Sequence, residues 1–214
     1  MLENIAIFSG LSRPELDILE NHMITRTFRK NTVVINEGDQ ANSFYIILSG
    51  MVKVFLSNED GKEIIINTLG EGDHFGELAL LDDEPRSASI MTTEKSSLGT
   101  ISKADFVNVL GKHPELALKL IQELTRRVRL LSDNVKTLAL LDVYGRVAKT
   151  LLGMAKHEDG MLLIENRPTQ QDIANRIGAS REMVARIMKD LATGNYISID
   201  GKRLIINEKL PDAY

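Results

Sequence analysis

Residues 169–195 read TQQDIANRIGASREMVARIMKDLATGN, and this stretch decides how the last third of the chain folds. Thr169 and Ser180 are good N-cap residues, and each stands before a run with apolar residues at helical spacing. Gly178 lies between the two runs, where a helix can end in a left-handed turn. The pattern therefore predicts two helices joined by a tight turn, the helix-turn-helix arrangement.

The second predicted helix has two chemically different faces when it is laid out at 100° per residue. One face is apolar, and the other carries charges around the small Ala185. A solvated surface helix has similar charges, but the capped helix and turn before it favour DNA reading. Arginine forks onto guanine and a carboxylate accepts from cytosine, so the predicted base readers are Arg181, Glu182 and Arg186. The predicted phosphate contacts are Thr169, Gln170, Ser180 and Lys202.

The segments on either side complete a winged domain. Asp142 is a suitable N-cap for a helix over 142–157, and MLLI at 161–164 reads as a short strand. YISIDGKRLIIN at 196–207 reads as a hairpin that turns at Asp200-Gly201. We therefore assign 142–214 to a winged helix-turn-helix DNA-binding domain.

The first half of the chain has a β-type texture. TVVI, SFYIIL, MVKVFL and EIIINTL, between Thr32 and Leu69, alternate with turn signals rich in Gly, Asn and Asp. Short strands at close spacing predict an antiparallel β-barrel or jelly roll over 1–112. A short helix opening with a Ser12–Glu15 capping box precedes them. The predicted fold class is therefore α+β.

A long helix is predicted between these parts, over 113–141. Pro114 suits a first helical turn, and a seam spaced by fours and threes follows: Leu120, Leu124, Val128, Leu131, Val135 and Leu138. Such a seam either packs on the core of its own domain or pairs with a second copy. The length of the helix favours pairing, and hence a homodimer.

Composition and charge narrow the classes of function. The chain has 214 residues and a net charge of −4. Residues 143–214 carry 11 Lys and Arg against 9 Asp and Glu, whereas the remainder carries 15 against 21. An acidic part joined to a mildly basic part indicates two parts with different functions. The absence of cysteine excludes disulfides and thiolate metal sites, and no apolar run approaches a membrane span or a signal peptide, so we expect a cytoplasmic protein.

A second stretch, FGELALLDDEPRSAS at 75–89, interrupts the β-type runs. Glu77 and Arg86 stand near the apolar run 78–81, where a charged group must be satisfied if it is buried. Either the two side chains form an internal salt bridge, or they await a ligand. A buried arginine is a natural counter-charge for a cyclic phosphodiester, which is a monoanion.

Two long motifs carry a family resemblance. YIILSGMVKVF at 45–55 with GDHFGELALLDDEPRSAS at 72–89 resembles a cyclic-nucleotide-binding cassette. LALLDVYGRVAKTLL at 138–152, followed by the helix-turn-helix, resembles the cyclic AMP receptor protein (catabolite activator protein, CRP-FNR) family of transcription regulators. The resemblance implies that cyclic AMP binds the β-roll as an allosteric effector and enables binding to palindromic double-stranded DNA with TGTGA-like half-sites. It also implies RNA polymerase as a partner.

The resemblance gives roles to seven residues of the effector site. Glu77 would accept from the ribose 2′-hydroxyl, Arg86 would pair with the cyclic phosphate, and Ser87 would donate to a phosphate oxygen. Gly76 would leave room for the nucleotide, and backbone N–H groups up to Leu78 would add donors. Two more residues lie on the long helix, Arg127 and Ser132. The adenine would be faced by Ser132 of the partner subunit.

Two positions depart from the family pattern. Leu131 stands where the family has a threonine that hydrogen-bonds the adenine, so cyclic GMP, a cyclic dinucleotide such as cyclic di-GMP, or activity without effector stay open. Gln170 stands where the family has an arginine on a phosphate. It releases no counterion, so a slightly shallower salt dependence is expected.

Three other classes of function compete. An enzyme is disfavoured, because the four histidines are dispersed and no P-loop, Rossmann or nucleophile-elbow motif is present. A haem sensor of the same superfamily would need His74 as ligand, although a lone histidine in a turn is more often a surface residue. A nucleotide-binding module that regulates a protein partner would not need the charged face of the predicted recognition helix. No metal site is expected.

Overall fold

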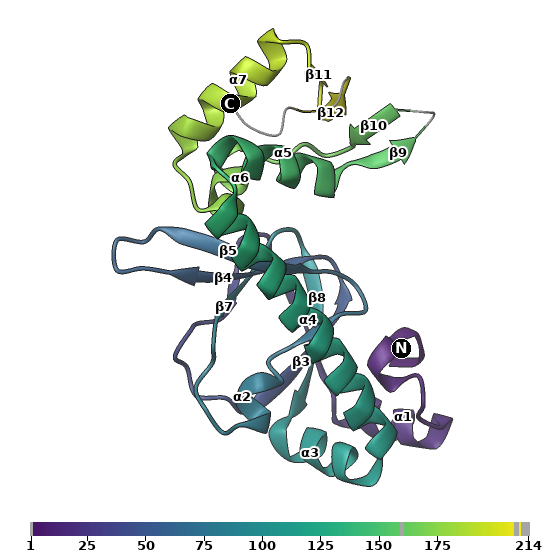
Figure 1. Cartoon of the computed structure of the whole chain (residues 1–214). Coiled ribbons are helices and arrows are strands. Elements are labelled where there is room, and N and C mark those ends of the chain that lie inside the picture. The colour runs from purple at the N-terminus through teal and green to yellow at the C-terminus, as the bar shows by residue number, and fades with distance from the viewer. Residues whose placement is uncertain (1, 159–160, 208–209, 211–214) are drawn as a thin grey trace. The chain divides into compact units, whose positions relative to one another are not determined.

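The computed structural model describes residues 2–158, 161–207 and 210. The chain divides into two compact units, residues 1–56 with 65–129 and residues 57–64 with 130–214, and Figure 1 labels most of their elements. The predicted limits 1–112, 113–141 and 142–214 stay predictions about domains, because α4 (Pro114–Leu140) runs from one unit into the other.

The first unit contains two four-stranded sheets whose described strand pairs are antiparallel. One sheet has the order β1-β8-β3-β6 and the other β2-β7-β4-β5. Their strands are β1 (Ile24–Phe28), β2 (Val33–Ile35), β3 (Ser43–Ser49), β4 (Val52–Ser57), β5 (Glu63–Leu69), β6 (His74–Phe75), β7 (Ser89–Thr92) and β8 (Ser96–Ser102). This confirms the predicted β-roll.

Strand β3 is covered on both faces because its side chains alternate between two cores. Ile47 belongs to the core between the sheets, with Tyr45 packed against it, and Leu98 and Phe75 fill the same space. Phe44 and Ile46 instead enter a second core. Phe44 stacks on Phe106 there, with ring centroids 4.4 Å apart.

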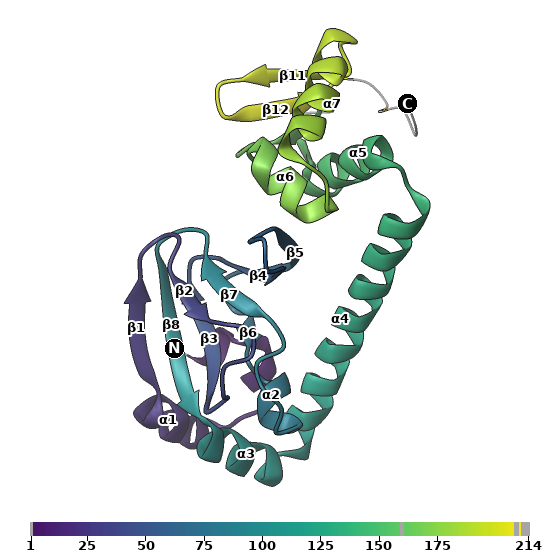
Figure 2. The ribbon, with the colours of Figure 1, turned by 90° about the vertical axis from the view of Figure 1, so that its left-hand side faces the viewer.

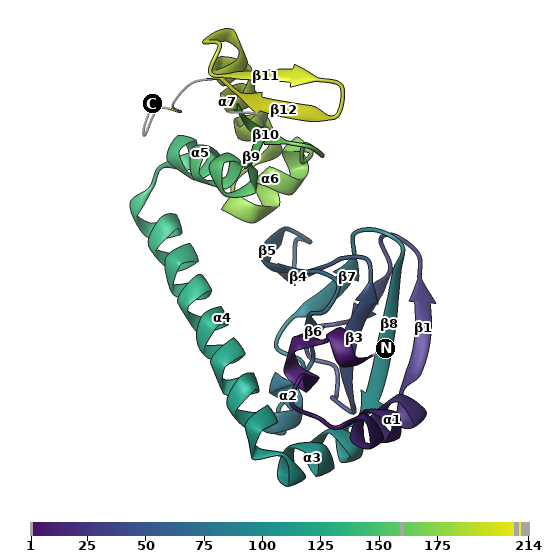
Figure 3. The ribbon, with the colours of Figure 1, turned by 90° about the vertical axis from the view of Figure 1, so that its right-hand side faces the viewer.

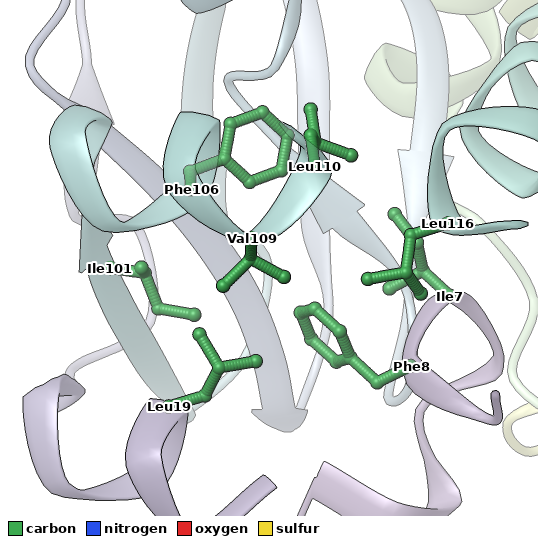
Figure 4. Close-up of a pocket in the computed structure, with 8 residues that line it drawn as sticks. All are labelled: Ile7, Phe8, Leu19, Ile101, Phe106, Val109, Leu110 and Leu116. Atoms are coloured by element: carbon green, nitrogen blue, oxygen red, sulfur yellow. The ribbon is translucent and has the colours of Figure 1, made fainter. Parts of the chain in front are cut away.

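Helices close the second core at one end of the sheets. They are α1 (Arg13–His22), α3 (Lys103–Lys112) and the start of α4, with two short 3-10 turns at Leu2–Asn4 and Ala6–Phe8. Figures 2 and 3 both show α1 and α3 together at the end of the β1/β8 pair. A void of about 10 Å³ remains between them, and Figure 4 shows only apolar side chains around it. An apolar void of this size stays dry.

The predicted seam of α4 has two different environments. Leu120 is buried and Leu124 is partly buried in the core of the first unit, as the packing alternative expected. Further along, Val128, Leu131 and Val135 are 62%, 41% and 65% exposed within one chain. Ile121, one heptad before Val128, is also exposed. The later turns of the helix therefore present an apolar face that is largely exposed within one chain.

The second unit holds the winged arrangement. Its elements are α5 (Val143–Met154), β9 (Lys156–Glu158), β10 (Met161–Ile164), α6 (Gln170–Ile177), α7 (Arg181–Thr193), β11 (Ile197–Asp200) and β12 (Arg203–Ile206). The strands form one sheet in the order β11-β12-β10-β9. The Asp142 side chain accepts from the Gly145 N–H at 2.7 Å and caps α5, as predicted. Buried residues of the three helices and the sheet share one core.

Some local expectations need correction. The wing turns at Gly201 and Lys202, one residue later than predicted, because Asp200 still pairs with Arg203 in the ladder. Helix α3 was not assigned from the sequence, although Ser102 caps it by accepting from the Asp105 N–H. Within the part of the chain that the structure describes, no helix is both long and apolar enough to cross a bilayer.

Candidate effector and DNA sites

Arg86 is the centre of the candidate effector site. It directly precedes the turn into β7, and only 7% of it is exposed. Its Nη1 donates to the carbonyl of Gly76 at 2.8 Å, and its Nη2 donates to the carbonyl of Ser43 at 2.7 Å. The Tyr45 ring centroid lies 5.8 Å from its Cζ. Burial lowers the pKa of Arg86 from its ordinary value, because water is withdrawn from the charge.

Glu77 does not pair with Arg86, so the internal salt bridge considered for these two residues is not formed. Glu77 is 1% exposed, and its Oε1 accepts from Arg127 Nη1 at 2.8 Å. Its Oε2 is buried without a hydrogen-bond partner. Burial raises the pKa of Glu77, and the Arg127 charge opposes that rise. The arrangement leaves one buried carboxylate oxygen able to accept a hydrogen bond.

Arg127 is anchored at all three of its nitrogens. Besides the bond to Glu77, its Nη2 donates to the His74 carbonyl at 2.8 Å, and its Nε donates to Glu123 Oε1 at 3.1 Å. Glu123 also receives a two-pronged contact from Arg126, at 2.9 and 2.7 Å. The hydrogen bonds from Arg126 are the first cause that lowers the pKa of Glu123 to about 2, so this carboxylate is ionised at neutral pH.

The remaining predicted effector residues lie at the edges of this cluster. Gly76 has a φ of 86° and touches Arg86 through its carbonyl. Leu78 is 44% exposed at the start of the short helix α2 (Leu78–Leu81), and Ser87 is exposed beside Arg86. Ser132 is exposed on α4. The structure thus brings Gly76, Glu77, Arg86 and Arg127 together, and the role of Ser132 stays a prediction.

The sequence interpretation missed three contributors and misplaced one histidine. Ser43 and His74 contribute backbone carbonyls. Every residue type has a backbone carbonyl, so the sequence gives no signal for these two contacts. Glu123 stands four residues before Arg127, and that spacing could have indicated an ion pair on one helix face. His74 is 5% exposed in β6 and packs on the Phe44 ring, so the expectation of a surface turn residue was wrong.

The candidate DNA surface is built on two capped helices. The Thr169 hydroxyl accepts from the Asp172 N–H, and the Ser180 hydroxyl accepts from the Met183 N–H. Gly178 ends α6 with φ 64° and ψ 38°, the left-handed turn that the sequence predicts. On α7, Val184, Ile187 and Leu191 are buried. The opposite face is exposed and carries the three predicted base readers: Arg181, Glu182 and Arg186.

A surface hollow of about 550 Å³ joins part of this set to the wing. Thr169, Gln170 and Arg181 line it, together with Arg167, which the sequence interpretation did not single out. The Arg167 N–H donates to the Lys202 carbonyl at 2.8 Å, which ties the segment before α6 to the turn of the wing. Over the described residues, His, Asp and Glu side chains do not gather into any group of three that could hold a metal ion.

Comparison with known proteins agrees with this geometry. Residues 25–113 match the family model described as cyclic nucleotide-binding domain, and residues 145–209 match the Crp-like helix-turn-helix domain. The cAMP-activated global transcriptional regulator CRP of Salmonella typhimurium is 34% identical over 200 residues, covering 90% of this chain and 94% of that protein. The chain belongs to the CRP-FNR family.

Two further proteins are similar to this CRP-FNR protein, one in sequence and one in fold. The CRP-like cAMP-activated global transcriptional regulator of Mycobacterium tuberculosis is 32% identical over 212 residues, covering 97% of this chain and 95% of that protein. The structure of the c-di-GMP responsive global regulator CLP of Xanthomonas campestris superposes with a TM-score of 0.78 at 23% identity, covering 92% of this chain and all of that chain. The latter shows the shared fold. The two curated relatives are cAMP-activated global transcriptional regulators, and this chain matches both a cyclic nucleotide-binding domain and a Crp-like helix-turn-helix domain.

Proposed function

We propose that this protein is a dimeric transcription regulator, not an enzyme, whose binding to palindromic DNA is controlled by a cyclic nucleotide. The observation that carries the effector site is the state of Arg86. It is a buried cation whose guanidinium contacts two neutral carbonyls and no carboxylate of the described residues. An anion at this position would supply the missing counter-charge.

The effector is a cyclic nucleotide with a 2′-hydroxyl, and cyclic AMP is the first choice. A cyclic phosphodiester carries one negative charge, which balances Arg86. The unpartnered Oε2 of Glu77 would accept from a ribose hydroxyl. The named CRP relatives are cAMP-activated, which supports this choice. Leu131 offers the base no hydrogen bond, so cyclic GMP and cyclic di-GMP are the alternatives to test.

The dimer is supported by the exposed face of α4. Ile121, Val128 and Val135 follow each other at intervals of seven residues and are 57%, 62% and 65% exposed in one chain. Leu131 and Leu138 lie three residues after Val128 and Val135, at the other apolar position of the heptad, and are 41% and 37% exposed. This is the spacing with which two helices interdigitate in a coiled coil. A second copy of α4 would bury the whole stripe.

The DNA-binding step follows from the winged domain and the dimer together. Two copies of α7 would present Arg181, Glu182 and Arg186 to two half-sites related by a two-fold axis, with TGTGA as the implied half-site. Effector bridging Arg127 of one subunit and Ser132 of the other would favour the arrangement that fits DNA. Such a regulator acts with RNA polymerase and in the cytoplasm, where bacterial DNA lies.

The test is DNA binding with and without effector, in a buffer of fixed salt. Nucleotide-free protein is titrated onto a labelled duplex with two TGTGA half-sites, with and without cyclic AMP. Wild type and the exposed-site control Arg29→Leu should bind more tightly with cyclic AMP, whereas Arg86→Leu should lose that response. Calorimetry should show one cyclic AMP per chain in the wild type and no binding by Arg86→Leu.

Each negative result points to a different error. An Arg86→Leu variant with a full cyclic AMP response would rule out the effector site. No response by the wild type to cyclic AMP, but a response to cyclic GMP or cyclic di-GMP, would change only the effector. No retention of any palindromic duplex would favour a module that regulates a protein partner.

A further inference from the structure

Glu123 is not among the residues proposed to touch the effector, yet it holds one of their side chains. It is one helical turn before Arg127 on α4, and its Oε1 accepts from the Nε of that arginine at 3.1 Å. Its side chain is 24% exposed, and that of Arg127 is 16% exposed. The ion pair is thus partly withdrawn from solvent, where charge pairs contribute more than at an open surface.

The contacts of Arg127 show what this ion pair does. Each nitrogen of the planar guanidinium has a different acceptor: Glu123 for Nε, Glu77 for Nη1 and the His74 carbonyl for Nη2. A planar group held at three points has little freedom to rotate about its side-chain bonds. Without Glu123, only the two end nitrogens would remain anchored, and the side chain would regain rotamers.

The fixed guanidinium in turn fixes the Glu77 carboxylate. Glu77 is almost completely buried, and Arg127 Nη1 is the side-chain donor on its Oε1. That bond determines where Oε2, which has no partner, is presented. Burial raises the pKa of Glu77, the Arg127 charge lowers it, and the Glu123 charge raises it, so Glu123 can help Glu77 only through the placement of Arg127 and not through its own charge.

We propose that Glu123 is a positioning residue for the effector: through Arg127 it orients Glu77 to accept a hydrogen bond from the ribose 2′-hydroxyl. This inference rests on the proposed function. Glu123 would not touch the nucleotide, so its effect on binding depends on whether the ligand has that hydroxyl. A 2′-deoxy cyclic nucleotide has no hydroxyl for an oriented Glu77 to accept from, so its affinity should depend on Glu123 much less than that of cyclic AMP does.

The experiment is calorimetric titration of the full-length protein with cyclic AMP and with 2′-deoxy cyclic AMP. Glu123→Gln keeps the size and helix propensity of the side chain and removes its charge. We expect it to weaken cyclic AMP binding by about three- to tenfold, while the affinity for the deoxy ligand stays within about twofold. Glu115→Gln is the matched control, because it makes the same change on the same helix, and the Glu115 side chain is 48% exposed and contacts His113 instead of Arg127. It should leave the ratio of the two affinities near the wild-type value.

The outcomes separate this inference from the proposed function. Equal weakening of both ligands by Glu123→Gln, or weakening of neither, would overturn the positioning role while the effector site stands. Wild-type protein that binds neither these two ligands nor cyclic GMP and cyclic di-GMP would overturn the effector site, and the role of Glu123 with it. A loss confined to cyclic AMP would support both.

Discussion

Gly76 is the residue at which backbone conformation bears on the proposed effector site. Its φ of 86° is in the left-handed region, and a Cβ built on it would lie 2.6 Å from Arg86 Nη1. Gly76→Ala should therefore both strain the backbone, by about 1–2 kcal/mol, and push the guanidinium off its carbonyl. Loss of a charged hydrogen bond predicts cyclic AMP binding weakened by about tenfold or more. Chemical denaturation and calorimetry measure the two effects separately.

Gly72 is the matched control for that substitution. Its φ is 87°, but a Cβ there would have nothing within 4 Å. Gly72→Ala should lose a similar amount of stability and keep its affinity for cyclic AMP. If both alanine variants lost affinity equally, the effect would come from backbone strain and not from the displacement of Arg86.

His74 gives the fold a predictable dependence on pH. Burial, and then the charge of Arg127, lower its pKa from 6.5 to about 4. Between these values only the unfolded chain holds the proton, so stability rises with pH across this window and falls as pH drops. The full effect is about 3 kcal/mol. His74→Phe cannot titrate, so its stability relative to wild type should increase from pH 6.5 down to pH 4 in denaturation measurements.

The reference for this prediction is a histidine at the surface. His157→Phe changes an exposed position of β9 and tests the effect of removing any histidine. A difference between His74→Phe and wild type that stayed constant with pH would mean that His74 is not penalised for its charge in the folded state.

At the residue scale, the sequence indicates which side chains carry charge into the site but not how they pair. Glu77 and Arg86 are nine positions apart, and a mutual salt bridge was a reasonable alternative. The structure pairs Glu77 with Arg127, which is 50 residues away, and gives Arg86 two backbone carbonyls. Long-range pairs and carbonyl acceptors depend on tertiary packing, which one sequence does not encode as a local pattern.

At the scale of elements, α4 gives the sharpest test of assembly. Val135 is 65% exposed in one chain and lies in the heptad of Ile121 and Val128. Val135→Asp would place a charge in the apolar seam of the proposed coiled coil, where it would have no partner, and should convert dimer to monomer. Light scattering after size exclusion measures the change.

Gln122→Asp, at an exposed position outside the stripe, should leave the dimer intact. A dimeric Val135→Asp protein would show that another surface holds the copies together.

Elements were predictable where local signals agree. Caps at Ser12, Asp142, Thr169 and Ser180 mark the starts of four helices, and each is present in the structure. Helix α3 follows directly on β8 with a single cap at Ser102, so the change from strand to helix falls within one residue and was missed. The α4 seam changes its environment after Leu124 without any change in its spacing. Periodicity identifies an apolar face but not what covers it.

At the scale of the whole molecule, α4 connects the two activities. Ser132, the predicted contact to the partner's effector, is followed by Asp133, whose carboxylate accepts from Lys149 Nζ of α5 at 2.7 Å. The Thr137 hydroxyl, one turn later, contacts the same Lys149 nitrogen at 2.6 Å. The turns of α4 that would respond to the nucleotide are therefore tied to the first helix of the DNA-binding domain.

Coupling through this helix has a consequence that does not depend on its structural details. If cyclic AMP raises the affinity for DNA by some factor, DNA must raise the affinity for cyclic AMP by the same factor. A typical coupling of about 1–3 kcal/mol corresponds to about 5- to 150-fold. Because a dimer on one palindromic duplex binds two cyclic AMP molecules, the product of the two fold-changes in cyclic AMP affinity, measured with and without saturating duplex, should equal the factor found from DNA binding. If the two measured values differ, cyclic AMP acts on something other than this two-site equilibrium, such as the dimerisation of α4. Repeating the titrations at several protein concentrations would identify that case, because dimerisation depends on concentration.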